Sequence, residues 1–187
     1  MDLEEFWKII EDSQDECQGR DDAQCQALLE LLAELELADI LLWKKILDSY
    51  MELSDRPGLW AAAYLINSGC DEECFHDFRA WLISQGREVY LAALVNPDSL
   101  AEFPREIKCA AECEALIHVP ALAYSLQKGL EAPDYDGFHE ELLNTALPDE
   151  IREEMENEIL YGDGMDETWE VDELPESLPE LYAVFAG

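Results

Sequence analysis

The chain has 187 residues, of which 45 are acidic and 11 are basic, and its formal net charge is −34 with the histidines neutral. Direct binding to nucleic acid and adhesion to anionic membranes both need clustered Lys and Arg residues, so this charge excludes both. Disorder of the whole chain is also excluded, because 49% of the residues are hydrophobic and 5 Trp, 7 Tyr and 6 Phe can form a core.

Helical periodicity dominates the first third of the chain. Apolar residues spaced three or four apart predict a short helix around Phe6–Ile10 and two further helices over Leu28–Leu35 and Ile40–Tyr50. The dipeptide Pro57-Gly58 breaks this pattern and starts a new element.

The middle of the chain predicts a second group of helices. Leu59–Asn67 is a short apolar helix, and Gly69 closes it in a left-handed conformation. Asp71–Gln85 is the next helix, with acidic residues in its first turn, where the helix dipole favours negative charge. Gly86 ends this helix, and Arg87–Val95 is the one that follows.

A turn at Asn96–Ser99 precedes a longer helix over about Arg105–Lys128, which Pro120 bends or interrupts. No run of alternating β-branched residues predicts a strand. We therefore predict an all-α protein, folded as a single-domain irregular helical bundle.

The last third of the chain is far more acidic than the rest. Residues 131–187 contain 19 acidic residues and one basic residue, a net charge of −18. Ala132–Gly137 is predicted to be a turn or linker, and Glu150–Leu160 a charged helix. The apolar residues of Leu178–Phe185 predict a short helix that docks back on the domain. We thus divide the chain into a helical core domain, residues 1–130, and an acidic C-terminal segment.

The sequence also bears on the compartment. The N-terminal residues Met1–Glu5 lack the basic start and apolar run of a secretory signal. No stretch approaches the roughly 18 uninterrupted apolar residues of a membrane helix. We predict a cytoplasmic protein whose six cysteines are mostly reduced.

Two pairs of cysteines have helical spacing, and two interpretations remain open. Cys70 and Cys74 are four residues apart, as are Cys109 and Cys113, so each pair can share one helix face. Four thiolates that converge can hold a structural metal ion such as zinc. The alternative is that these residues are small buried thiols, because cysteine is among the most buried residue types.

The richest stretch is LWAAAYLINSGC from Leu59 to Cys70, then FRAWLISQGREVY from Phe78 to Tyr90, with PDSL at Pro97–Leu100. This stretch resembles the bacterial DUF4240 family. Members carry a similar LW-AA helix, a GGC-acidic turn, an F-FR-WLI-QGR-V segment and PDSL. Ser68 stands where the family has its second glycine. Phe6-Trp7 and the terminal Leu178–Phe185 resemble the two ends of the family's sequences.

The resemblance implies no defined activity, because the function of the family is unsolved. The names of some members hint at the regulation of molybdenum metabolism. No catalytic residue and no cofactor is predicted, since the sequence contains no phosphate-binding loop and no His-Glu-x-x-His motif.

The central block also contains polar and aromatic residues that can line a pocket for an anion or a small molecule, because arginine forks bind anions and aromatic rings wall such sites. The alternative is that Arg79 forms a structural ion pair, for which Glu72 and the acidic residues of other helices are candidate partners. The candidate binding residues are Trp60, Asn67, Asp71, Glu72, Arg79, Trp81, Gln85 and Arg87.

Three functional hypotheses follow from the charge and the central block. The first is a non-enzymatic interaction protein that binds a basic protein partner, in an inhibitor, immunity-like or nucleic-acid-mimic role. The second is a sensor of a small ligand or anion, with a pocket around Arg79 and Arg87. The third is a structural metal-binding protein that uses the four cysteines named above. We favour the first, and the sequence does not define an oligomeric state.

Overall fold

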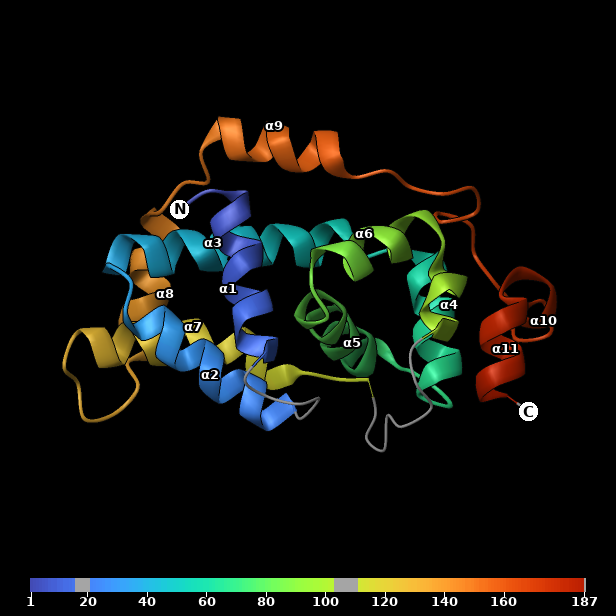
Figure 1. Ribbon diagram of the computed structural model, residues 1–187, viewed down its shortest axis with the longest axis horizontal. Coiled ribbons are helices and arrows are strands. Elements are labelled where there is room, and N and C mark those ends of the chain that lie inside the picture. Colours follow the sequence, from blue (N-terminus) through green and yellow to red (C-terminus); the bar gives the residue numbers. More distant parts are fainter. Residues whose placement is uncertain (16–20, 103–110, 187) are drawn as a thin grey trace. The chain divides into compact units, whose positions relative to one another are not determined.

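Figure 1 shows the computed structural model, which describes residues 1–15, 21–102 and 111–186. Within these residues every regular element is a helix, which confirms the predicted all-α class. In chain order the elements are α1 (Leu3–Asp15), α2 (Asp21–Ala33), α3 (Leu37–Leu53), α4 (Pro57–Ile66), α5 (Glu72–Ser84), α6 (Arg87–Val95), the 3₁₀ helix η1 (Pro97–Glu102), α7 (Glu114–Gln127), α8 (Tyr135–Asn144), α9 (Asp149–Glu158), α10 (Leu174–Ser177) and α11 (Pro179–Phe185).

Two segments differ from their predictions. The helix expected from about Arg105 begins only at Glu114, and the part of that prediction at residues 105–110 lies outside the described residues. Pro120 lies inside α7, which continues through it. Part of the expected linker at Ala132–Gly137 is the start of α8, because the Asp134 side chain accepts a hydrogen bond from the Gly137 amide and caps this helix.

The described chain forms two compact units, each built from two stretches of sequence. The first unit comprises residues 1–50 and 113–158, and the second comprises residues 51–112 and 159–187. The predicted division into a core domain, residues 1–130, and an acidic C-terminal segment stays a prediction.

The first unit is built around aromatic side chains of α1 and α3. Phe6 and Trp43 are fully buried, and their ring centroids lie 5.0 Å apart. Trp7 donates a hydrogen bond from Nε1 to the Tyr50 hydroxyl at 3.0 Å. That hydroxyl in turn donates to Glu158 at the end of α9. The polar atoms of Trp7 and Tyr50 are thereby satisfied inside the core, whereas Nε1 of Trp43 is buried with no hydrogen-bond partner among the described residues.

The second unit contains α4, α5, α6 and η1 together with the two C-terminal helices. Its core includes the fully buried side chains of Leu59, Phe78 and Tyr90. The last helix, α11, contacts α4 and η1 and buries Leu181 completely. The docking of the acidic segment as a whole on a separate core domain stays a prediction.

None of the helices that the structure describes combines the length and the apolar character that crossing a bilayer requires.

Candidate functional site

The candidate site lies at the junction of α4 and α5, where the backbone turns sharply. Two consecutive residues have positive φ angles, Ser68 at 57° and Gly69 at 124°. The Gly69 amide donates to the Tyr64 carbonyl at 2.8 Å and closes the end of α4, as the sequence predicts. Ser68 occupies the left-handed region that glycine adopts most easily, at the position where the family has its second glycine.

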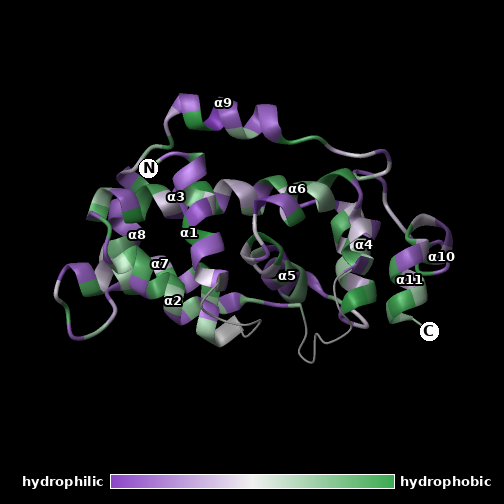
Figure 2. Cartoon of the chain, viewed as in Figure 1, coloured by the Kyte–Doolittle hydropathy of each residue, from purple (hydrophilic) through white to green (hydrophobic). Residues whose placement is uncertain are grey.

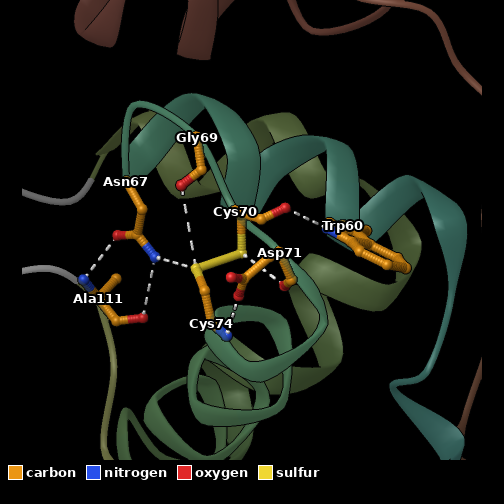
Figure 3. The surroundings of a disulfide bond; sticks show 7 residues. All are labelled: Trp60, Asn67, Gly69, Cys70, Asp71, Cys74 and Ala111. Atoms are coloured by element: carbon orange, nitrogen blue, oxygen red, sulfur yellow. Dashed lines mark hydrogen bonds between the residues drawn. A yellow bond between two sulfur atoms is a disulfide. The ribbon is translucent and has the colours of Figure 1, made fainter.

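This turn brings Cys70 back to the first turn of α5, where it forms a disulfide with Cys74 (Figure 3). The two Cα atoms are 5.3 Å apart. Asp71 is the N-cap of α5, and its Oδ1 accepts a hydrogen bond from the Cys74 amide at 2.9 Å. The same five residues are therefore held both by a helix cap and by a covalent link.

Two further side chains hold this turn in place. Asn67 donates a hydrogen bond from Nδ2 to Cys74 Sγ at 3.4 Å. It also binds the backbone of Ala111, whose amide donates to Asn67 Oδ1 at 2.7 Å. Trp60 donates from Nε1 to the Cys70 carbonyl at 2.9 Å. Figure 3 shows that these groups surround the disulfide on several sides. Of the predicted binding residues, Trp60, Asn67 and Asp71 thus meet here.

Carboxylates gather beside the disulfide. The pKa of Glu112 is raised above its ordinary value, first by partial burial and then by the negative charges of Asp77, Asp71 and Glu73. Glu112 directly follows Ala111, which Asn67 holds beside Cys74, and Asp71 caps the cysteine turn, so both carboxylates border this turn.

The guanidinium of Arg79 contacts other groups of the fold. Its Nη1 donates to the Met51 carbonyl at 2.8 Å and lies 3.6 Å from Asp55 Oδ2. The guanidinium also lies over the Phe75 ring, 4.9 Å from its centroid. Met51 is in the last turn of α3, where unpaired carbonyls favour a cation. The ion-pair partner that the structure gives Arg79 is thus Asp55, an acidic residue outside α5, rather than the candidate Glu72.

The remaining predicted residues lie farther along α5. Trp81 is buried in the core and packs on Phe78, with ring centroids 5.4 Å apart. Gln85 donates to the Trp81 carbonyl at 3.2 Å and ends the helix, and Arg87 begins α6. Asp71 and Gln85 bracket α5, so about 20 Å of helix separates them. The eight residues are therefore distributed over α4, α5, α6 and the junctions between these helices, and their joint role in one pocket stays a prediction.

The pairing of the cysteines differs from the arrangement that the metal hypothesis predicts. Cys70 and Cys74 are joined in a disulfide, whereas zinc needs thiolates. Cys113 lies 3.7 Å from Cys25, sulfur to sulfur, and both remain buried thiols. Cys109 lies outside the described residues. Within the described part of the chain, no three His, Cys, Asp or Glu residues are placed to hold a metal ion.

Sequence reasoning missed one further polar contact of the second unit. Asp98, in the Pro97–Leu100 motif, accepts hydrogen bonds from the amides of Glu180 at 3.0 Å and Leu181 at 2.8 Å. The motif was predicted only as a turn. Its buried carboxylate caps α11, a role that the spacing of Pro97–Leu100 alone does not signal.

These features define an acidic all-α protein with a cross-linked and capped helix start at the junction of α4 and α5. The chain belongs to the family described as protein of unknown function (DUF4240), whose family model matches residues 1–126. The resemblance noted from the central block is thereby confirmed. The matched region ends inside α7, so α8 to α11 follow it. No curated protein and no solved structure matches the chain.

Proposed function

We propose that the protein is a non-enzymatic interaction protein that binds a basic protein partner through its acidic surface. An inhibitor, an immunity protein or a nucleic-acid mimic would each use such a surface. The proposal is supported by the net charge of −34 and by the way α9 presents its share of it.

One face of α9 is anchored and the other is acidic. Ile151 and Met155 are buried, and α9 contacts α1 within the first unit. Figure 2 shows α9 as a largely hydrophilic helix. Its basic residue, Arg152, is paired with Asp149 at 3.0 Å. The exposed carboxylates of this helix, which we call the α9 face, are Asp149, Glu150, Glu153, Glu154 and Glu156.

Repulsion between the carboxylates of the α9 face lowers the stability of α9. Glu150 lies four residues before Glu154, and Glu153 lies three residues before Glu156. Like charges at such spacings destabilise a helix by about 0.2–0.5 kcal/mol per pair. A cationic partner that covers this face removes the repulsion and gains attraction, and the field of the whole chain accelerates its approach.

The proposal predicts salt-sensitive binding that depends on the α9 face. The variant Glu150→Gln/Glu153→Gln/Glu154→Gln/Glu156→Gln should bind a protein captured from the native cell extract at least tenfold more weakly, because four contacts to cationic groups are lost. For the unaltered protein, Kd should rise at least tenfold between 50 and 300 mM salt. Isothermal titration calorimetry with the purified captured protein measures both quantities.

The matched control carries the same charge change at four exposed glutamates of the second unit, Glu52→Gln/Glu88→Gln/Glu102→Gln/Glu176→Gln. Its Kd should stay within about threefold of the value of the unaltered protein. The control weakens the long-range attraction to the partner but keeps the contacts of the α9 face. Equal weakening by both variants would reject the α9 face as the binding surface. Binding that does not change with salt, or no specific capture at low salt, would reject the proposal itself.

A second candidate function, an anion sensor, is favoured by one observation. Nε of Arg79 is buried and has no hydrogen-bond partner among the described residues. A buried guanidinium N–H without an acceptor can donate a hydrogen bond to an oxygen of a bound anion. The opposing observation is that Nη1 of the same side chain is already engaged at the end of α3.

Arg79→Met separates these roles. Because it removes a charged hydrogen bond to the Met51 carbonyl, we expect the free energy of unfolding to fall by about 2 kcal/mol in urea denaturation. For an anion site, sulfate or molybdate must raise the Tm of the unaltered protein above the effect of chloride at equal ionic strength, and Arg79→Met must abolish the difference. Equal effects of the three salts on the unaltered protein would leave Arg79 with a structural role alone.

A further inference from the structure

We infer that the Cys70–Cys74 pair is a thiol–disulfide exchange site, which a dithiol protein reductant opens by attack on Cys70 while the fold is kept. The inference does not rest on the proposed binding of a basic partner. It rests on the position of the disulfide, on the hydrogen bonds around it and on the charges beside it (Figure 3).

The first step concerns what happens to the turn when the disulfide opens. The link joins residues only four apart, and such a short loop gains little from a covalent constraint. The same turn is fixed by the Asp71 cap on the Cys74 amide and by the Trp60 hydrogen bond to the Cys70 carbonyl. Both interactions use groups other than sulfur, so they persist in the dithiol form.

The second step concerns which sulfur is attacked. Cys74 lies in the first turn of α5, where the helix dipole stabilises a thiolate, and Asn67 Nδ2 already donates to its Sγ at 3.4 Å. Cys70 precedes the cap, and its sulfur lies in an exposed contact with the Asp71 carbonyl at 3.7 Å. Cys74 is therefore the better leaving group, and the attack falls on Cys70.

The exchange balances without any other reactant. A thiolate of the reductant attacks Cys70 Sγ, the Cys70–Cys74 bond breaks, and its electron pair leaves on Cys74 Sγ, which takes up a proton. In the mixed disulfide, the first sulfur of the reductant is bonded to Cys70. The second thiolate of the reductant attacks this first sulfur and releases Cys70, which also takes up a proton. Two electrons pass to the protein, and the reductant becomes a disulfide. The reverse reaction needs an oxidised dithiol of the same class.

The third step concerns which thiols can approach. Several acidic residues border the disulfide turn: Glu73 precedes Cys74 in the first turn of α5, and Glu112 follows Ala111, which Asn67 holds beside Cys74. Asp71, at the cap, is one of them. An attacking thiolate is itself an anion, so additional negative charge on the reagent slows its approach and positive charge accelerates it. The site therefore favours a reductant with a neutral or basic face over an anionic thiol such as glutathione.

The test is the reduction of the full-length protein by three small thiols that differ in charge: cysteamine, 2-mercaptoethanol and mercaptoethanesulfonate. Acid quenching, alkylation and peptide mass mapping follow each cysteine separately. At 20 mM salt and equal thiolate concentration, cysteamine should reduce the pair at least tenfold faster than mercaptoethanesulfonate. The ratio should shrink to about threefold or less at 500 mM salt, because the field is screened. The transient adduct should lie on Cys70, and far-UV circular dichroism should not change on reduction.

Charge variants identify the source of the discrimination. Glu73→Gln/Asp77→Asn/Glu112→Gln should reduce the rate ratio severalfold. The control Glu150→Gln/Glu153→Gln/Glu154→Gln, with the same charge change on α9, should leave it unchanged, so loss of partner binding and loss of thiol selectivity are separable. The inference is overturned if the two cysteines stay thiols after exposure to an oxidised dithiol, if the adduct lies on Cys74, if reduction unfolds the helices, or if both charge variants behave alike.

Discussion

Asp98→Ala is expected to lower the free energy of unfolding by about 2–3 kcal/mol and to loosen α11. The carboxylate is buried and accepts the amides of Glu180 and Leu181 with its two oxygens. Without it, two amides at the start of α11 have no acceptor, and a hydrogen bond to a charged group contributes about 1.5–3 kcal/mol. The negative charge at a helix N-terminus adds a favourable dipole interaction.

Urea denaturation measures the loss, and hydrogen exchange of the Leu181 amide locates it. Asp98→Asn keeps one carbonyl oxygen in nearly the same volume, so its loss should be about half as large. Asp172→Ala, at an exposed acidic residue of the same C-terminal stretch, should stay within about 0.5 kcal/mol of the unaltered protein. Unchanged protection of Leu181 in Asp98→Ala would show that this cap does not hold α11.

The contact of Asp98 with α11 marks the limit of what the sequence predicts about the fold. Helical periodicity predicts the central helices within a residue or two, and the apolar residues of Leu178–Phe185 predict the last helix. Periodicity carries no signal for a hydrogen bond between residues 82 and 83 positions apart. The start of α7 was misplaced for a related reason, because residues just before Glu114 have helical composition but no cap that the pattern reveals.

The candidate site was predicted in part. Trp60, Asn67 and Asp71 meet at the disulfide, because each borders the α4–α5 junction that the glycine pattern indicates. The disulfide was missed, since a four-residue spacing was interpreted as one helix face, whereas Cys70 lies before the helix. What brings its sulfur to Cys74 is the left-handed backbone at Ser68 and Gly69, and a serine in that conformation leaves little trace in a sequence.

The redox state of each cysteine depends on its local surroundings, and the prediction of mostly reduced cysteines did not consider them. That expectation follows from the predicted compartment alone. Among the described cysteines, Cys25 and Cys113 remain thiols and are buried between helices of the first unit, whereas Cys70 and Cys74 are oxidised in a turn at the surface of the second. Accessibility and local geometry separate the two pairs, and neither property follows from composition.

Gly162→Ala is expected to destabilise the second unit by about 3 kcal/mol, because overpacking against a rigid neighbour costs that much or more. A Cβ atom at Gly162 would lie 1.8 Å from the Val95 carbonyl oxygen and 2.9 Å from the Val95 carbonyl carbon. Both are backbone atoms at the end of α6, so no side chain can rotate away. The Gly162 amide also donates to the Leu94 carbonyl at 3.1 Å, and the displaced segment would lose this bond.

Gly164→Ala is the matched control two residues along the same loop. Gly164 has a φ of 82°, but its nearest neighbouring atom lies 4.0 Å from the added Cβ. The substitution should therefore cost only the backbone strain, about 1–2 kcal/mol. Thermal and urea unfolding compare the two variants. Because Tyr161, next to Gly162, donates to the Leu53 carbonyl and lies under the Arg56 guanidinium, Gly162→Ala should also weaken these two contacts of Tyr161. A loss no larger than that of Gly164→Ala would mean that the loop does not lie against α6 as closely as the backbone of Val95 requires.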